Sequence, residues 1–390
     1  MWIFKLSAIL LAYLAMNIYT GIRVFDSLKY FFPFFGAFVF WPIYIVLCYS
    51  LILVMLLRLD RVFFIRQAGM YSLPFFAYFF FALITLDALR LGLQHLTIAT
   101  PAPNLPVIYT GIAAGIAVLF MVYGTLRARK IHTTRYEIHL DKGSTIESPL
   151  RIALISDLHI GVTVGRKWIA DIVDAVNRAE PHIVCIAGDI FDNDIGAVRD
   201  REGVAEELRR LNAPLGVFAS QGNHDVDKIS WRASANGEAA AGRIKEFLKE
   251  AGITFLLDEA ILVADSFYIL GRRDASPIGS RHTRKTAADL AEDLDRSKPL
   301  IFLDHQPIDF PAKDAAGADL ILSGHTHRGQ IFPGSIVTKR MFKEAGAVHY
   351  GYWRGRNAQG VVTSGAGIWG PPMRIGSISE VVVINAIFGQ

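Results

Sequence analysis

The first 126 residues contain four long stretches that are almost free of charged side chains. Because a helix needs roughly 20 apolar residues to cross a bilayer, each stretch is long enough to span one. They run from about Ile3 to Ile22, Phe34 to Leu57, Met70 to Leu91 and Pro106 to Leu126. After Arg127 the composition becomes the mixed one of a water-soluble α/β protein. We therefore predict a four-helix transmembrane domain over residues 1–130 and a globular domain over residues 131–390.

The first stretch has an alternative interpretation as a cleaved signal peptide, with Lys5 at its charged end. We favour a retained span, because large residues such as Tyr13, Met16 and Tyr19 continue the stretch without a small-residue cleavage site. Four retained spans would place both ends of the chain on the same side of the membrane.

Most basic residues near the predicted spans fall on one side of the membrane. They are Lys5, Arg58, Arg61, Arg66, Arg127, Arg129 and Lys130. The loop after the first span carries only Arg23 and Lys29, and the loop after the third span carries no Lys or Arg. The positive-inside rule then predicts a multi-pass protein with its globular domain in the cytoplasm.

Charge and cysteine content limit the partners of the chain. A net charge of +4 is too small to indicate a nucleic-acid-binding protein. The basic residues around the last span would instead suit an anionic lipid bilayer. The two cysteines, Cys48 and Cys185, lie in apolar segments, so we expect no disulfide framework.

Short apolar runs alternate with helical patterns after Arg127, which is typical of an α/β or layered α+β domain. Six runs predict buried strands: residues 150–156, 182–188, 215–220, 266–271, 299–304 and 319–324. Apolar residues recur at helical spacing in segments 165–180 and 242–252, and Gly252 suits a helix end. We expect a loop over residues 230–242 and a further helix over residues 285–299.

Metal-ligating side chains follow the ends of five predicted strands. The strand ends lead into Asp157 and His159, into Asp189, into the GNHD run of residues 222–225, into His305, and into His325 and His327. Each motif alone has an ordinary explanation as a polar turn. Loops at the carboxyl ends of strands converge in open α/β sheets, however, so five such motifs together predict one metal centre.

The series D-x-H, GDxxD, GNHD, a later His and GHxH resembles the calcineurin-like metallophosphoesterases over about Tyr136 to Ala386. The runs GHTHRGQ and GPPMRIG look most like a bacterial membrane-associated branch, which includes phosphodiesterases and relatives of the lipid A precursor pyrophosphatases. Arg328 departs from the glycine common in that branch. The resemblance implies a four-layer αββα sandwich. Together with the orientation predicted from the basic residues, it places the catalytic domain on the cytoplasmic side of a bacterial inner (plasma) membrane.

The resemblance also implies a centre of two divalent metal ions. The implied ligands are Asp157, His159 and His327 for one metal, Asn223, His305 and His325 for the other, and Asp189 for both. Carboxylate oxygen and imidazole nitrogen suit Mn, Fe or Zn, and the motifs offer no thiolate.

Two metals roughly 3.5 to 4 Å apart can bridge a hydroxide that attacks phosphorus in line. By the same resemblance, His224 would act as a general acid or hydrogen-bond donor at the leaving oxygen, with Asp225 orienting its ring. Asp192 would support the ligands from a second shell. The alternative for His224 is a plain turn residue.

Three arginines near the predicted centre are candidates for substrate binding. Arg272 and Arg273 follow a predicted strand and could bind a second phosphate or an acidic headgroup, although simple solvation explains them equally well. Arg328 lies within the GHTHRGQ run itself.

Aromatic and basic residues are interleaved over residues 332–356, directly after the last predicted ligands. This pattern would suit a lipid headgroup interface, and a partly buried loop covering the sandwich is the alternative. In the first case the segment would border the metal centre at the membrane surface.

We therefore predict a membrane-embedded two-metal phosphohydrolase that cleaves a phosphoester or pyrophosphate bond of a membrane lipid. One alternative is the same chemistry on a soluble phosphodiester or nucleotide, with the membrane part as an anchor. Another is a non-catalytic metal-binding interaction scaffold, against which His224 argues, since a scaffold has no need of a leaving-group acid.

Overall fold

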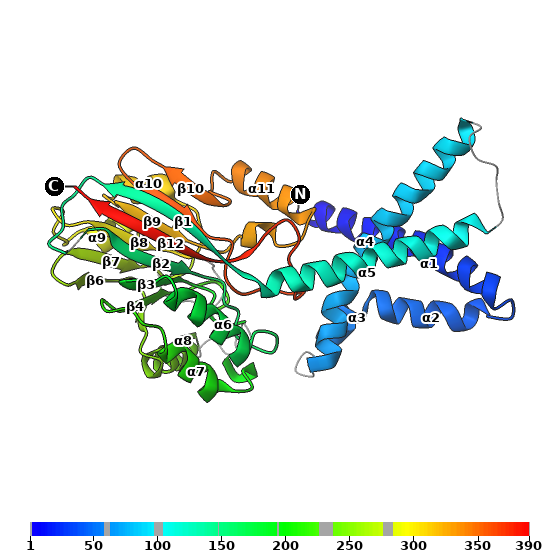
Figure 1. Ribbon diagram of the computed structural model, residues 1–390, viewed down its shortest axis with the longest axis horizontal. Helices are drawn as coiled ribbons and strands as arrows, with labels where there is room; N and C mark the ends of the chain where they lie inside the picture. The colour runs from blue at the N-terminus through cyan, green and yellow to red at the C-terminus, as the bar shows by residue number, and fades with distance from the viewer. Residues whose placement is uncertain are drawn as a thin grey trace. The chain divides into compact units, whose positions relative to one another are not determined.

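The computed structural model describes residues 2–57, 63–96, 104–146, 148–192, 195–225, 237–275 and 284–389 (Figure 1). The chain forms two compact units. One comprises residues 1–126 and 370–372, and the other comprises residues 127–369 and 373–390. The change in composition after Arg127 thus falls where the second unit begins.

The N-terminal unit is helical. Its helices are α1 (Trp2–Phe31), α2 (Ala37–Cys48), α3 (Ser50–Leu56), α4 (Phe63–His95) and α5 (Leu105–Arg129). Among the described residues, two segments, Phe64–His95 and Leu105–Arg129, are long and apolar enough to cross a membrane. These two helices contain the third and fourth predicted spans.

The first two predicted spans differ from the last two. The span expected over residues 34–57 is divided between α2 and α3, because the chain leaves helical geometry at Tyr49 (φ −102°, ψ 13°). The span expected over residues 3–22 lies in α1, but several of its first side chains lie outside the described residues, as do Arg58 and Arg61. A membrane domain of four spans therefore stays a prediction.

The C-terminal unit is built on two six-stranded mixed sheets (Figure 1). The order in the first sheet is β1 (Ile131–Leu140), β12 (Ser379–Phe388), β2 (Leu150–Ile155), β3 (Ile183–Ala187), β4 (Val217–Ser220) and β5 (Thr254–Leu256). The order in the second sheet is β10 (Gly351–Arg354), β11 (Gln359–Val362), β9 (Leu320–Ser323), β8 (Leu300–Leu303), β7 (Phe267–Gly271) and β6 (Glu259–Val263). Strands β2 to β5 run parallel, as do β7, β8, β9 and β11.

Three apolar clusters hold four layers together. In β3, Ile183 and Cys185 face the second sheet, whereas Val184 and Ile186 face the helices on the other side. Helices α6 (Arg166–Asn177), α7 (Arg201–Arg209) and α8 (Gly237–Glu250) cover the first sheet. Helices α9 (Ala287–Ala291) and α10 (Phe310–Ala315) cover the second sheet. Since both faces of these strands are buried, their sequences are almost continuously apolar.

The six predicted strands and the two amphipathic helices are confirmed, and Gly252 follows α8 with φ +74°. Two other expectations are wrong in part. Residues 237–242, expected in a loop, begin α8, because Ala and Glu favour the helix even in a run of small residues. Of the helix expected over 285–299, only Ala287–Ala291 is α-helical. Residues 230–236 lie outside the described part of the chain.

Candidate metal centre

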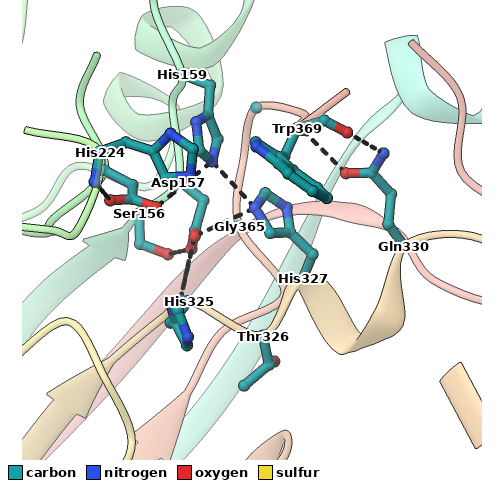
Figure 2. Close-up of polar contacts among 12 residues, drawn as sticks. Ser156, Asp157, His159, His224, His325, Thr326, His327, Gln330, Gly365 and Trp369 are labelled. Atoms are coloured by element: carbon teal, nitrogen blue, oxygen red, sulfur yellow. Dashed lines mark hydrogen bonds and ion pairs between the residues drawn. The ribbon is translucent and has the colours of Figure 1, made fainter. Parts of the chain in front are cut away.

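Side chains from five strand ends of both sheets come together in the C-terminal unit. Three groups each place their possible ligand atoms within 4.8 Å of one another. The groups are Asp157 with His159 and His327, Asp189 with His305 and His325, and His159 with Asp189 and His224. Figure 2 shows Asp157, His159, His325 and His327 around one small volume. The Asp189 carboxylate belongs to two of the groups, so it links them.

Short distances between ring nitrogens indicate what the cluster is built to hold. The Nε2 atoms of His159 and His327 lie 3.1 Å apart, and Nδ1 of His325 lies 3.2 Å from Nε2 of His305. Two lone pairs aimed at one another repel unless a proton or a cation lies between them. Nε2 of His305 is also 3.1 Å from the Asn223 side-chain oxygen. The donors present therefore fit divalent cations that accept nitrogen and oxygen ligands.

Burial keeps the imidazoles in the form that binds metal. Burial lowers the pKa of His159 and of His325 to about 4, and it lowers the pKa of His327 well below its usual range. These rings are therefore neutral near pH 7 and have a lone pair available, as metal binding requires. His305 differs, because its contact with Asp189 outweighs burial and raises its pKa well above the usual value.

Five of the predicted ligands sit in the left-handed region of backbone conformation. Their φ angles are 53° at Asp157, 48° at His159, 51° at Asp189, 73° at His325 and 47° at His327. This region is uncommon for residues other than glycine, and such strain concentrates at functional sites. Sheet-like hydrogen bonds hold the strained turns, including those from the Asp157 and His159 amides to the carbonyls of Gly188 and Asp189, both of 3.0 Å.

Gly324 explains why the GHTH run begins with glycine. A Cβ atom at this position would lie 2.2 Å from the Ser156 hydroxyl and 2.5 Å from a carboxylate oxygen of Asp157. The missing side chain lets the amide of the next residue, His325, donate to the Asp157 carboxylate at 3.0 Å. The strand end β9 therefore packs directly on the strand end β2.

The Asp225 side chain, next to the predicted general acid His224, connects two loops by hydrogen bonds. The carboxylate of Asp225 accepts hydrogen bonds from the amides of Ile190 and Phe191, both at 2.9 Å, and from that of Gly222 at 2.8 Å. Asp225 therefore does not orient the His224 ring as predicted, because backbone donors occupy its oxygens. Asp192 is the carboxylate beside that ring, with its oxygen 3.8 Å from Nδ1 of His224.

Each of the three arginines predicted to bind substrate contacts another side chain of the protein. Arg272 is buried and forms an ion pair of 3.0 Å with the buried carboxylate of Asp304. Arg273 lies 3.6 Å from Asp258, and the Arg328 guanidinium stacks over the ring of Tyr350. Phosphate binding by these residues stays a prediction, and for Arg272 the contact with Asp304 competes with it.

Arg374 is a buried residue of this region to which the sequence assigned no role. It is fully buried, and its guanidinium donates to the carbonyl oxygens of Ser364, Gly365 and Gly367 at 2.8, 3.1 and 2.7 Å. This loop packs on the first ligand turn, because a Cβ on Gly365 would lie 2.7 Å from Cβ of Asp157. Arg374 therefore holds this loop against the turn that carries Asp157. The only signal in the sequence was its place in the GPPMRIG run.

Replacing Arg374 with methionine is expected to lower the free energy of unfolding by about 3 kcal/mol, because buried carbonyls would lose a charged donor. The melting temperature should fall by about 6–12 °C, which near-UV circular dichroism in detergent would measure. The exposed Arg178, changed to methionine in the same way, serves as the control. Equal melting temperatures for the two variants would show that Arg374 contributes nothing to stability.

The four-layer fold and the imidazole–carboxylate cluster at its strand ends define an α/β domain with a metal-dependent catalytic site. The calcineurin-like phosphoesterase family matches residues 150–329 of the chain. The globular unit is therefore a calcineurin-like metallophosphoesterase domain, which makes it a metal-dependent phosphoesterase.

Relatives of known sequence agree with this assignment. An uncharacterized metallophosphoesterase of Campylobacter jejuni is 28% identical over 271 residues, which are 68% of this chain and 67% of that protein. One of Aquifex aeolicus is 29% identical, over 69% of this chain and 97% of that protein. A Danio rerio protein described as a transmembrane protein with metallophosphoesterase domain is 32% identical, over 70% of this chain and 62% of that protein.

Proposed function

We propose that this protein is a membrane-embedded phosphohydrolase that uses two metal ions to cleave a phosphoester or pyrophosphate bond of a membrane lipid. The observation that carries the reaction class is the convergence of Asp157, Asp189 and their histidine neighbours at the strand ends. Two helices of membrane-spanning length support the choice of a membrane substrate. So does the description of the Danio rerio relative as a transmembrane protein.

Two divalent cations, when bound, would lower the pKa of water and stabilise the charge that builds on phosphoryl oxygens. Asp157, His159 and His327 would hold one cation, and Asn223, His305 and His325 would hold the other. The Asp189 oxygen that would bridge them lies 3.7 Å from His159 and 3.1 Å from His305. Manganese, iron and zinc all suit these donors.

His224 would donate a proton to the leaving oxygen. Its side chain is 12% exposed, and its ring lies edge-on to that of His159 with 4.8 Å between centroids. It therefore stands beside the predicted ligands and still reaches solvent. Asp192, whose carboxylate oxygen lies 3.8 Å from Nδ1 of His224, would orient that ring, which is the role that the sequence had predicted for Asp225.

The site of action in this proposal is the cytoplasmic face of a bacterial inner membrane, reached by a multi-pass N-terminal domain. The excess of basic residues on one side of the predicted spans supports this orientation. The runs GHTHRGQ and GPPMRIG support the bacterial membrane-associated branch and its lipid substrates.

Removal of metal is expected to abolish hydrolysis of an aryl phosphodiester, and Mn²⁺ is expected to restore it, because the bound cations would supply the activated water that attacks phosphorus. Absorbance of the released aryl alcohol measures both. Activity that survives exhaustive chelation would contradict the metal-dependent mechanism. No activity with any of Mn²⁺, Fe²⁺ or Zn²⁺ would favour the non-catalytic scaffold.

Mass spectrometry tests the lipid substrate. The Mn²⁺-loaded protein is mixed with a bacterial membrane extract, and lipids and water-soluble products are compared with those from a His224→Ala sample. We expect one lipid class to decrease and a matching headgroup product to appear. An unchanged lipid profile from protein that cleaves the aryl phosphodiester would favour a soluble phosphodiester or nucleotide instead.

A further inference from the structure

The helix α11 (Gly334–Glu344) follows the last predicted ligands and exposes an unusual surface. It begins seven residues after His327 and lies at the end of the globular unit away from the C-terminus of the chain (Figure 1). None of its residues is buried. Ile336, Val337 and Met341 are 60, 57 and 61% exposed.

The exposed surface of α11 combines apolar and basic side chains. Val337 and Met341 are one helical turn apart, so they lie on the same side of the helix. Lys339, Arg340 and Lys343 are also exposed, and Glu344 is the one acidic residue in the helix. Helices that lie in the headgroup region of a bilayer have this composition, with apolar residues entering the lipid and cations at the phosphates.

The opposite side of α11 is held against the candidate metal centre. The Phe342 ring packs on that of His325 with 6.1 Å between centroids, and on that of His349 at 5.9 Å. The Thr338 hydroxyl lies 2.9 Å from Nε2 of His349. One helix therefore carries an exposed apolar surface on one side and contacts a predicted ligand with the other.

An exposed aromatic residue also borders this region. Trp369 is 53% exposed, and its ring centroid lies 6.2 Å from that of His224. Its main chain exchanges two hydrogen bonds, of 3.0 and 2.7 Å, with the side chain of Gln330, four residues before α11. Figure 2 shows this pair beside His327. Tryptophan favours the interface between lipid and water.

We propose that α11 docks on an anionic lipid surface and so holds the metal centre at the level of the headgroups. A purely aqueous surface would leave three large apolar side chains hydrated within a single helix of 11 residues. Lys339 and Lys343 complement anionic lipids, whereas Arg340 pairs with Glu344 at 2.7 Å. The helices of the same chain that are long and apolar enough to cross a membrane would keep a bilayer within reach. This inference adds a lipid-binding surface to the proposed function. It rests on that function only for the purpose of the docking, which is to bring a lipid substrate to the metal centre.

The test uses the full-length protein in nanodiscs, with a polarity-sensitive fluorophore on Val337→Cys. The native Cys48 and Cys185 are 2 and 0% exposed, so they should not react. Spin-labelled lipid is added to discs of phosphatidylcholine alone or mixed with phosphatidylglycerol. The exposed Arg178→Cys at the end of α6 carries the same label as a control, and Met341→Cys is the second reporter.

On anionic discs we expect spin-labelled lipid to lower the emission at position 337 about twofold or more, and to leave that of the Arg178→Cys label unchanged. Changing both Lys339 and Lys343 to glutamine should reduce the quenching to the value on neutral discs. Equal emission with and without spin label at both reporters would overturn the proposal.

The measurement needs no turnover, so it separates this inference from the proposed function. Quenching at α11 without hydrolysis of any lipid would leave the docking surface intact and contradict the lipid substrate. Hydrolysis of a lipid by protein whose α11 label is never quenched would contradict the docking surface alone.

Discussion

His224→Ala is expected to lower kcat for an aryl phosphodiester by about 10²- to 10⁴-fold, the usual contribution of a general acid. Its ring lies beside His159 and 3.8 Å from Asp192, and in the proposed mechanism it would donate the proton to the leaving oxygen. The bound metal should remain at the wild-type level. Steady-state kinetics and metal analysis by mass spectrometry on the same samples measure both quantities. The exposed His139, changed to alanine, is the control.

The metal analysis decides between two roles for His224. Its ring nitrogen also lies within 4.8 Å of possible ligand atoms of His159 and Asp189, so the side chain could bind a metal itself. Loss of one equivalent of metal from His224→Ala would identify a ligand and contradict the role of acid. A kcat within a few-fold of the wild type would leave His224 as a turn residue.

Asp189→Ala is expected to reduce the bound metal to less than one equivalent and to lower kcat/KM by at least about 1,000-fold. The lost charge stabilisation in the transition state is worth several kcal/mol. Asp189 contacts His159 and His305, and one of its oxygens accepts from the His224 amide at 2.8 Å. No other described carboxylate belongs to two of the three ligand groups.

Metal analysis and activity measured with added Mn²⁺ check this prediction. Asp171→Ala is a matched control, because that residue lies on α6 and pairs only weakly with Lys167 at 3.7 Å. An Asp189→Ala protein that still holds two equivalents of metal would show that Asp189 does not bridge two ions. Full activity with excess Mn²⁺ would contradict its place in the mechanism.

The strands that carry the predicted ligands could be read from the sequence because both of their faces are buried. Runs such as residues 150–156 and 182–188 are apolar throughout, and a polar motif directly after such a run marks a strand end. Strand β1 was missed because its sequence IHTTRYEIHL contains no continuous apolar run, since several of its side chains are exposed. Its pairing with β12, more than 230 residues away, has no local signal.

The supporting residues of the centre were harder to predict than its candidate ligands. Asp225 follows His224 directly in the sequence, whereas Asp192 lies in a different loop. Only the folded structure shows that backbone amides hold the carboxylate of Asp225 and that Asp192 stands beside the His224 ring. The sequence left phosphate binding and simple solvation equally open for Arg272, but the strand after it brings the buried Asp304 within 3.0 Å. Arg374 reaches its carbonyl partners only through the folded 364–369 loop.

The side chains that could form the centre, and the order in which strands deliver them, can be predicted without the structure, because a strand and the motif at its end are adjacent in the chain. Tertiary structure decided which of those side chains meet, which carboxylate stands beside His224, and that α11 exposes Val337 while it packs Phe342 on His325. These features depend on the packing of two sheets whose partners are far apart in sequence, and packing is a property of the whole domain.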